Sequence, residues 1–377
     1  MRTCERSSLK KRGGWHAQRG RRAIRPGNRV QFLSPDTTVG IGTWASRILV
    51  AVEIAEKARI AQIRRMARSG KNPAVVTGIG DDCAVLRLLP GRGKEKDTLV
   101  TTDFTLEGIH FRRDWHPAEA VGHRCLARGL SDIAAMGGEP VAAFLSLALP
   151  RDLPQNWVGR FARSLISLAE RYRVILAGGD TAESPNGILA DIVVVGTAPK
   201  GKAVLRSGAR AGDLIYVSGE LGGSAAAVSE MLKKPKRKLN PRDYPRHFFP
   251  EPRIELGRIL REKDIASAMI DTSDGLSTDL AHICEDSGVG AEVQAELIPR
   301  AMVGKPPREV DLQFALHGGE DYELLFTAPR GKRVPTRIAG IPITRIGHVT
   351  RGRKIFLVNP GGVGYELQPR GWEHFRS

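Results

Sequence analysis

The sequence lacks the features that would place it in a membrane or stabilise it by disulfides. It contains no run of about 18 apolar residues, so we expect no membrane-spanning helix. The four cysteines are scattered and form no CxxC pair: Cys4, Cys83, Cys125 and Cys284. This spacing argues against a disulfide framework and a thiolate zinc site, and it suits a reducing cytoplasm.

Several common functional signatures are also missing. The nine histidines include no HxxxH spacing, so zinc is not expected. There is no GxxxxGK[ST] phosphate loop and no HRD or DFG set of protein kinases. Aromatic residues do not interleave with basic ones beyond Trp15, which argues against nucleic acid as a partner.

Much of the net charge of +17 lies at the N-terminus. Residues 1–50 hold nine Arg and two Lys against Glu5 and Asp36, which gives +9 and leaves +8 for the rest. A moderately basic body suits anionic small molecules. Three interpretations of residues 1–51 stay open: a nucleic-acid-binding arm, a transit peptide, or an over-extended translation start. We favour the last, with a disordered extension before residue 52.

Strand-like and helix-like segments mix along the whole chain. In the first half, strands are predicted at 83–89, 98–103, 141–150, 174–181 and 190–198, of which 141–150 is expected to be buried. Helices are predicted at 52–68, 117–137 and 156–173. A Gly- and Lys-rich connection after residue 198 suggests two domains, 52–198 and 199–377. The second half alternates similarly, so the sequence predicts a two-domain α/β or α+β protein.

Acidic residues recur beside glycine or small hydroxyl residues. In TGIGDDCAV (77–85), Asp81 and Asp82 are adjacent, and similar groups are TTD (101–103), SD (131–132), GGD (178–180), DTSDG (271–275) and GGED (318–321). We place TTD and GGD at strand ends, where open α/β folds bind ligands. Each group alone can be a turn or a helix cap. Their repetition favours convergence on hard cations such as Mg²⁺.

Two glycine-rich stretches are candidate anion sites. LRSGARAGD (205–213) contains Arg206, and SGELGGS (218–224) precedes a predicted helix. A helix N-terminus attracts anions, although glycine turns alone are weak signals.

Taken in order, eight motifs resemble the thiamine-monophosphate kinases of the aminoimidazole ribonucleotide synthase superfamily. They are GIGDDCAV, TTDFTLEGIHF, LARGLSDIAAMGGEP, LAGGDT, LRSGARAGDLIYVSGELGGSAA, MIDTSDGLSTDL, GGEDYELLF and the terminal GWEHF. The resemblance runs from near residue 54 to the end. The Arg-rich first fifty residues depart from the pattern.

The resemblance implies Mg²⁺-dependent phosphoryl transfer from ATP to thiamine phosphate, by a homodimer joined through strands of its N-terminal domains. The implied metal ligands are Asp82, Thr101, Thr102, Asp103, Asp132, Asp180, Asp271 and Asp274. The implied ATP contacts are Gly179, Asp180, Arg206 and Ser273. The implied thiamine phosphate contacts are His110, Glu320 and Trp372. No acid or base is implied; Asp82, Asp132 and Asp274 are expected to act electrostatically.

The chemistry explains a need for many carboxylates. The acceptor is a phosphate monoester with a second pKa of about 6, so it is already an anion. Two unit charges about 4 Å apart repel by ~4 kcal/mol at an effective dielectric constant of about 20. Mg²⁺ ions would cancel this repulsion and hold the two substrates in line, without a phospho-enzyme.

Alternatives remain for individual residues and for the function. Arg206 can be a surface cation, His110 a core imidazole and Trp372 a hydrophobic anchor rather than a ring stacked on a cation. Other members of the superfamily, and a nucleic-acid-binding protein that uses the basic arm, are the rival functions.

Overall fold

The computed structural model describes residues 60, 74–87 and 95–372. They belong to one compact unit, Glu53–Ser377. Apart from Ile60, the helix predicted at 52–68 lies outside the described residues, as does the whole of the basic segment 1–51.

The first half of the described chain is built on a six-stranded sheet. The order is β1-β2-β3-β6-β4-β5, and every pair is antiparallel except β4–β5. The strands are β1 (Val75–Thr77), β2 (Ala84–Leu86), β3 (Lys96–Leu106), β4 (Glu139–Leu149), β5 (Ile175–Glu183) and β6 (Leu189–Pro199). The predicted strands are therefore present, in an order that brings β3 and β4 to either side of β6.

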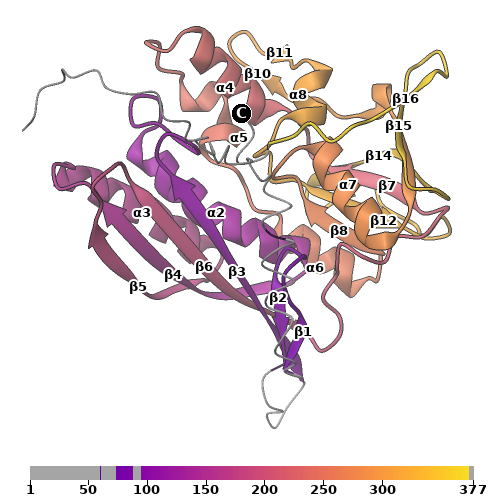
Figure 1. Cartoon of the computed structure of the whole chain (residues 1–377), viewed down its shortest axis with the longest axis horizontal. Helices are drawn as coiled ribbons and strands as arrows, with labels where there is room; N and C mark the ends of the chain where they lie inside the picture. The colour runs from indigo at the N-terminus through magenta and orange to yellow at the C-terminus, as the bar shows by residue number, and fades with distance from the viewer. Residues whose placement is uncertain (1–59, 61–73, 88–94, 373–377) are drawn as a thin grey trace, which may run out of the picture. The chain divides into compact units, whose positions relative to one another are not determined.

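Two helices, α2 (Ala118–Ala135) and α3 (Gln155–Arg171), cover one face of this sheet (Figure 1). Pro117 precedes α2, where its missing N–H costs nothing, and Gly137 follows it at φ 63°. The two helices approach closely because Gly122 has no side chain: a Cβ there would collide with the carbonyl oxygen of Phe161. The first hydrophobic core lies between these helices and the sheet.

The opposite face of this sheet is not covered by any described residue. Phe104 on β3 and Val141 and Phe144 on β4 are exposed there. The prediction of a buried strand at 141–150 is therefore only half right. The strand exists, but only alternate residues such as Ala143 and Leu147 reach the core, because helices cover one face alone.

The second half contains an eight-stranded mixed sheet of order β16-β15-β9-β14-β7-β12-β8, with β13 paired to β14. Its strands are β7 (Leu214–Ser218), β8 (Ala268–Asp271), β9 (Gly290–Gln294), β12 (Leu324–Ala328), β13 (Arg337–Ile338), β14 (Ile341–Thr350), β15 (Ile355–Val358) and β16 (Gly364–Glu366). A separate hairpin pairs β10 (Met302–Val303) with β11 (Arg308–Glu309). The helices are α4 (Gly223–Lys233), α5 (Pro245–Phe248), α6 (Ile254–Glu262), α7 (Leu276–Ser287) and α8 (Leu312–His317), with 3₁₀ turns η1 (Pro241–Asp243) and η2 (Ala295–Leu297).

Helix α2 also packs on the second half of the chain. Ala134 joins Leu256 of α6 and Met269 of β8 in a third hydrophobic cluster. Gly257 permits this contact, since a Cβ there would collide with the carbonyl oxygen of Ala134. One helix thus contacts both sheets, and its polar residues can meet those of either half.

Two predicted strand ends are wrong. TTD (101–103) and GGD (178–180) lie inside β3 and β5, which continue to Leu106 and Glu183. The strands continue because β6 pairs with β3 along its full length and β4 pairs with β5 up to Glu183. Among the described helices, none combines the length and the apolar character needed to cross a bilayer.

The contact at Gly122 gives a test of the helix packing. We expect Gly122→Ala to lower the free energy of unfolding by about 1–3 kcal/mol, because the added methyl group forces α2 away from α3. Gly159→Ala on α3 is the matched control: its methyl group meets only the flexible end of Arg163, and we expect about 0.5–1 kcal/mol of stabilisation. Urea unfolding measures both, and equal effects would contradict the packing described.

Candidate metal and substrate site

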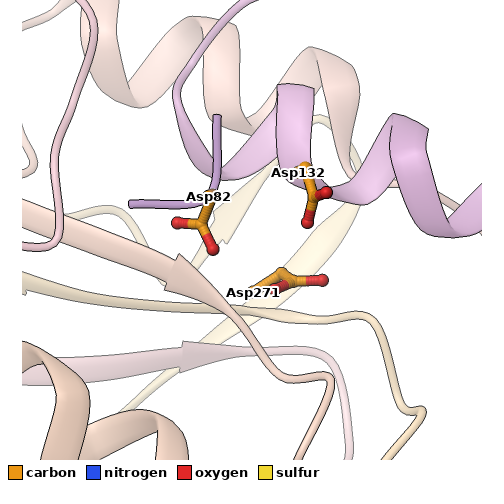
Figure 2. A group of neighbouring side chains, drawn as sticks. All are labelled: Asp82, Asp132 and Asp271. Atoms are coloured by element: carbon orange, nitrogen blue, oxygen red, sulfur yellow. The ribbon is translucent and has the colours of Figure 1, made fainter. Parts of the chain in front are cut away.

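Three aspartates from separate elements meet where α2 contacts the second half of the chain. Asp82 precedes β2, Asp132 lies on α2, and Asp271 ends β8. One carboxylate oxygen from each lies within 4.8 Å of the other two. Figure 2 shows the three side chains grouped around a common space. The structure thus brings together three of the carboxylates that the sequence predicted as metal ligands.

The donor set fits a hard divalent cation. Oδ2 of Asp82 is buried and has no hydrogen-bond partner among the described residues. Burial, followed by the charge of Asp271, holds the pKa of Asp132 well above its ordinary value. Burial, with the neighbouring Asp82, raises the pKa of Asp271 to about 7. A cation with oxygen ligands, such as Mg²⁺, would offset this repulsion.

Two hydroxyl groups orient these carboxylates. Thr101, a predicted ligand on β3, donates its hydroxyl hydrogen to Asp132. Ser131, which was not predicted as a site residue, donates to Oδ2 of Asp271 at 2.6 Å. Each hydroxyl therefore fixes one acid and leaves the second carboxylate oxygen for another partner.

Arg206 compensates part of the charge of the adjacent acids Asp81 and Asp82. Its Nη2 and Nε donate to Oδ1 of Asp82 at 2.6 and 3.2 Å. Its backbone N–H points at the carboxylate of Asp81 at 3.3 Å. Burial, followed by the charge of Asp82, raises the pKa of Asp81 to about 7. Arg206, which the resemblance implied as an ATP contact, is therefore bound to the carboxylate cluster through Asp82.

The predicted metal ligands on the strands divide between the two faces of the first sheet. Asp103 faces α2 and accepts a hydrogen bond from Arg128 at 3.0 Å. Thr102 faces the other way and donates to Asp191 at 2.7 Å. Asp180 pairs in register with Ser146, two residues after the outward-facing Phe144, so it too lies on the outer face.

Strand β5 further separates Gly179 and Asp180 from the cluster. It lies at the sheet edge opposite β1 and β2, with β4 and β6 between it and β3. Gly179 also has a packing role, because φ is 148° and a Cβ would collide with the carbonyl oxygen of Leu145. Within one chain, the structure does not bring these two residues to Asp82.

The remaining predicted residues are joined through their backbones. The carbonyl oxygen of Ser273 accepts from the N–H of Glu320 at 2.8 Å, and that of Asp274 accepts from the N–H of Trp372 at 3.0 Å. The indole of Trp372 is half exposed. The loop after β8, which holds Ser273 and Asp274, therefore binds the backbones of two residues predicted to contact thiamine phosphate, Glu320 and Trp372.

Glu320 and His110 lie beside this region in different settings. Glu320 accepts from Nη2 of Arg124 at 2.6 Å and from Nη1 of Arg128 at 3.4 Å. Burial opposes ionisation, but Arg124 and then Arg128 hold the pKa of Glu320 below its ordinary value. Nδ1 of His110 accepts from the backbone N–H of Leu106 at 3.0 Å, so a neutral ring carries its proton on Nε2.

Sequence reasoning missed both arginines. Their signal was present: Arg124, Arg128 and Asp132 follow one another at four-residue spacing on a predicted helix, which places them on one face. Asp321, in the GGED group expected to converge on cations, instead accepts from the N–H groups of Gly222 and Ser224 at 2.6 and 3.2 Å. The anion position predicted at the start of α4 is thus filled by the chain's own acid.

The raised pKa of Asp271 predicts how stability depends on pH. The folded chain binds more protons than the unfolded chain between about pH 4 and 7, so metal-free protein should lose stability as pH rises through that window. We expect Asp271→Asn to weaken this dependence. At pH 8, Mg²⁺ should raise the melting temperature of the wild type but not of the variant. Calorimetric melting curves measure both, and equal Mg²⁺ responses would refute the metal assignment.

Comparisons with known proteins identify the family to which the chain belongs. The family model for the N-terminal domain of AIR synthase related proteins matches residues 80–198, and that for their C-terminal domain matches 210–359. Thiamine-monophosphate kinase of Salmonella typhimurium is 39% identical over 313 residues, which are 80% of this chain and 93% of that protein.

Two solved structures are also similar. One is described as "AaThiL complexed with AMPPCP and TMP"; it has a TM-score of 0.73 and 33% identity over 85% of this chain and 97% of that one. The other is thiamine-monophosphate kinase from Stenotrophomonas maltophilia, with a TM-score of 0.62 and 33% identity over 79% and 95%. The chain therefore belongs to the thiamine-monophosphate kinase family of AIR synthase related proteins.

Proposed function

We propose that the protein transfers the γ-phosphoryl group of ATP to thiamine phosphate, which yields thiamine diphosphate and ADP. The observation that carries the proposal is the cluster of Asp82, Asp132 and Asp271, set in a fold shared with thiamine-monophosphate kinases. Support for the two substrates comes from the similar structure that holds AMPPCP and TMP.

In this proposal Asp82, Asp132 and Asp271 hold Mg²⁺, with Asp274 supplied by the same loop as Asp271. Bound Mg²⁺ would neutralise the charge that two anionic substrates bring together. Thr101 and Ser131 keep the carboxylates oriented, so the ligands need little rearrangement when substrates arrive.

The chain needs no general base for this reaction, because the acceptor phosphate is already ionised near pH 7. The work of the protein is to position the substrates and to exclude water. Trp372, anchored through its N–H to Asp274, presents a half-exposed indole on which the cationic thiazolium ring can stack. Arg206, fixed by Asp82, supplies a positive charge for the nucleotide phosphates.

We further propose a homodimer formed through the outer face of the first sheet. Phe104, Val141 and Phe144 are exposed on that face, and exposed apolar patches are typical of interfaces. Thr102 and Asp180 would then lie at the interface. We also propose a domain boundary near residue 198. A cytoplasmic location is proposed as well, and three free, buried cysteines among the described residues support it.

The activity itself is the first test. Purified protein with Mg²⁺, ATP and thiamine phosphate should form thiamine diphosphate, as measured by chromatography. Asp82→Asn should lower kcat by about 10²–10³-fold, because it removes one charge from the preorganised cluster. Asp114→Asn is the matched control, since Asp114 is exposed and its carboxylate pairs with Arg112, away from the cluster of Asp82, Asp132 and Asp271. Full activity of Asp82→Asn would exclude the proposed site.

The dimer has a separate test. Phe104→Asp should halve the mass measured by light scattering, because the new charge would be buried in the interface. Tyr365→Asp on β16 is the control: Tyr365 is as exposed as Phe104, at 58% against 53%, but lies in the second sheet. If Phe104→Asp keeps the mass of the wild type, the interface lies elsewhere.

A further inference from the structure

One face of α2 connects the carboxylate cluster with the residues predicted to contact thiamine phosphate. Arg124, Arg128 and Asp132 are spaced by four residues, so each lies about 6 Å along the helix from the next. Arg124 contacts Glu320, a predicted substrate residue, and Asp132 belongs to the carboxylate cluster. Arg128 therefore lies between the two parts.

The contacts of Arg128 join one residue from each part. Its Nη2 donates to Asp103, a predicted metal ligand, at 3.0 Å, and its Nη1 lies 3.4 Å from Oε1 of Glu320. Its side chain is 14% exposed, against 4% for Arg124. Nε of Arg128 has no hydrogen-bond partner among the described residues. A guanidinium has five N–H donors, so these two acids leave donors for a third anion.

The chain accepts backbone strain to make these contacts. Glu320 and Tyr322 have φ of 64° and 52°, a left-handed conformation that costs a non-glycine residue about 1–2 kcal/mol. Their N–H groups bond to the carbonyl oxygens of Ser273 and Thr272, which ties the strained loop to the end of β8. Strain of this kind concentrates at functional sites, so the Glu320–arginine contacts are not an incidental surface pair.

We propose that Arg128, oriented by Asp103 and Glu320, binds the phosphate group of thiamine phosphate and makes the site specific for a phosphorylated acceptor. The inference rests on the proposed function. In that reaction the acceptor phosphate must lie where the metal ligands and the substrate residues meet, which is where Arg128 is held. Arginine suits this position because its planar fork can hold carboxylate and phosphate oxygens together.

Removing Arg128 would also change the sign of the local charge. Arg124 and Arg128 together balance Asp103 and Glu320. With a neutral residue at 128, this group has a net negative charge, which repels a phosphate but not an unphosphorylated, cationic thiamine. Comparing the binding of thiamine phosphate with that of thiamine therefore separates recognition of the phosphate from recognition of the rings.

The test is calorimetric binding of thiamine phosphate and of thiamine to the full chain, with Mg²⁺ and AMPPCP present. Arg128→Gln should raise the Kd of thiamine phosphate by about 10–100-fold, the range for hydrogen bonds to charged groups, and leave the Kd of thiamine within about twofold. Arg160→Gln on α3, which removes an exposed arginine paired with Glu119, should change neither. Arg128→Lys keeps the charge and should show a smaller loss, again only for thiamine phosphate; it replaces the Gln variant if that one fails to fold.

Equal weakening of both ligands would overturn the inference, because it would make Arg128 a general support of the pocket. An unchanged Kd for thiamine phosphate in Arg128→Gln would overturn it as well, while the proposed function would stand. Failure of the wild type to bind thiamine phosphate would instead refute the proposed function, and the inference with it.

Discussion

Repulsion among clustered carboxylates, two of them buried and one half-buried, is the constraint on which the site depends. Asp82, Asp132 and Asp271 lie within reach of one ion, and an uncompensated charge in such a place is costly. The chain supplies part of the compensation itself, through Arg206 on Asp82 and Arg128 on Asp103. In the proposed function, the remaining negative charge is what Mg²⁺ would neutralise when it binds between these carboxylates and the substrate phosphates.

Helix α2 organises this balance. It carries Asp132 and Arg128 on one face and packs on both sheets. Two glycines let neighbouring helices pack closely on it: Gly122 of α2 leaves room for α3, and Gly257 of α6 leaves room for the carbonyl oxygen of Ala134. The residues proposed to hold the metal and the acceptor phosphate are therefore positioned by one rigid helix, which close packing holds in place. The same helix therefore contributes to the core of the first half and sets the geometry of the site.

The sequence predicted the part of the site that depends on local pattern. Asp132 lies on the helix predicted at 117–137, and Asp271 belongs to the DTSDG group that the repetition of acidic motifs singled out. The two faces of β3 could not be assigned in advance: Thr102 and Asp103 are adjacent, and only the pairing with β6 and the packing of α2 decide which one faces the cluster. Other features depend on contacts between residues distant in sequence, which a single sequence does not reveal. They are the length of β5, the position of Asp180 on an edge strand and the pairing of Glu320 with Arg124.

The bond between Trp372 and Asp274 has a practical consequence for handling the protein. Gly371 also fits closely there, since a Cβ would collide with the carbonyl oxygen of Asp274, and its N–H bonds to Thr278 at 3.0 Å. The last described residues are therefore fastened to the loop that bears two of the acidic side chains. Truncation or proteolysis that removes Gly371 and Trp372 would therefore release that loop as well as the end of the chain.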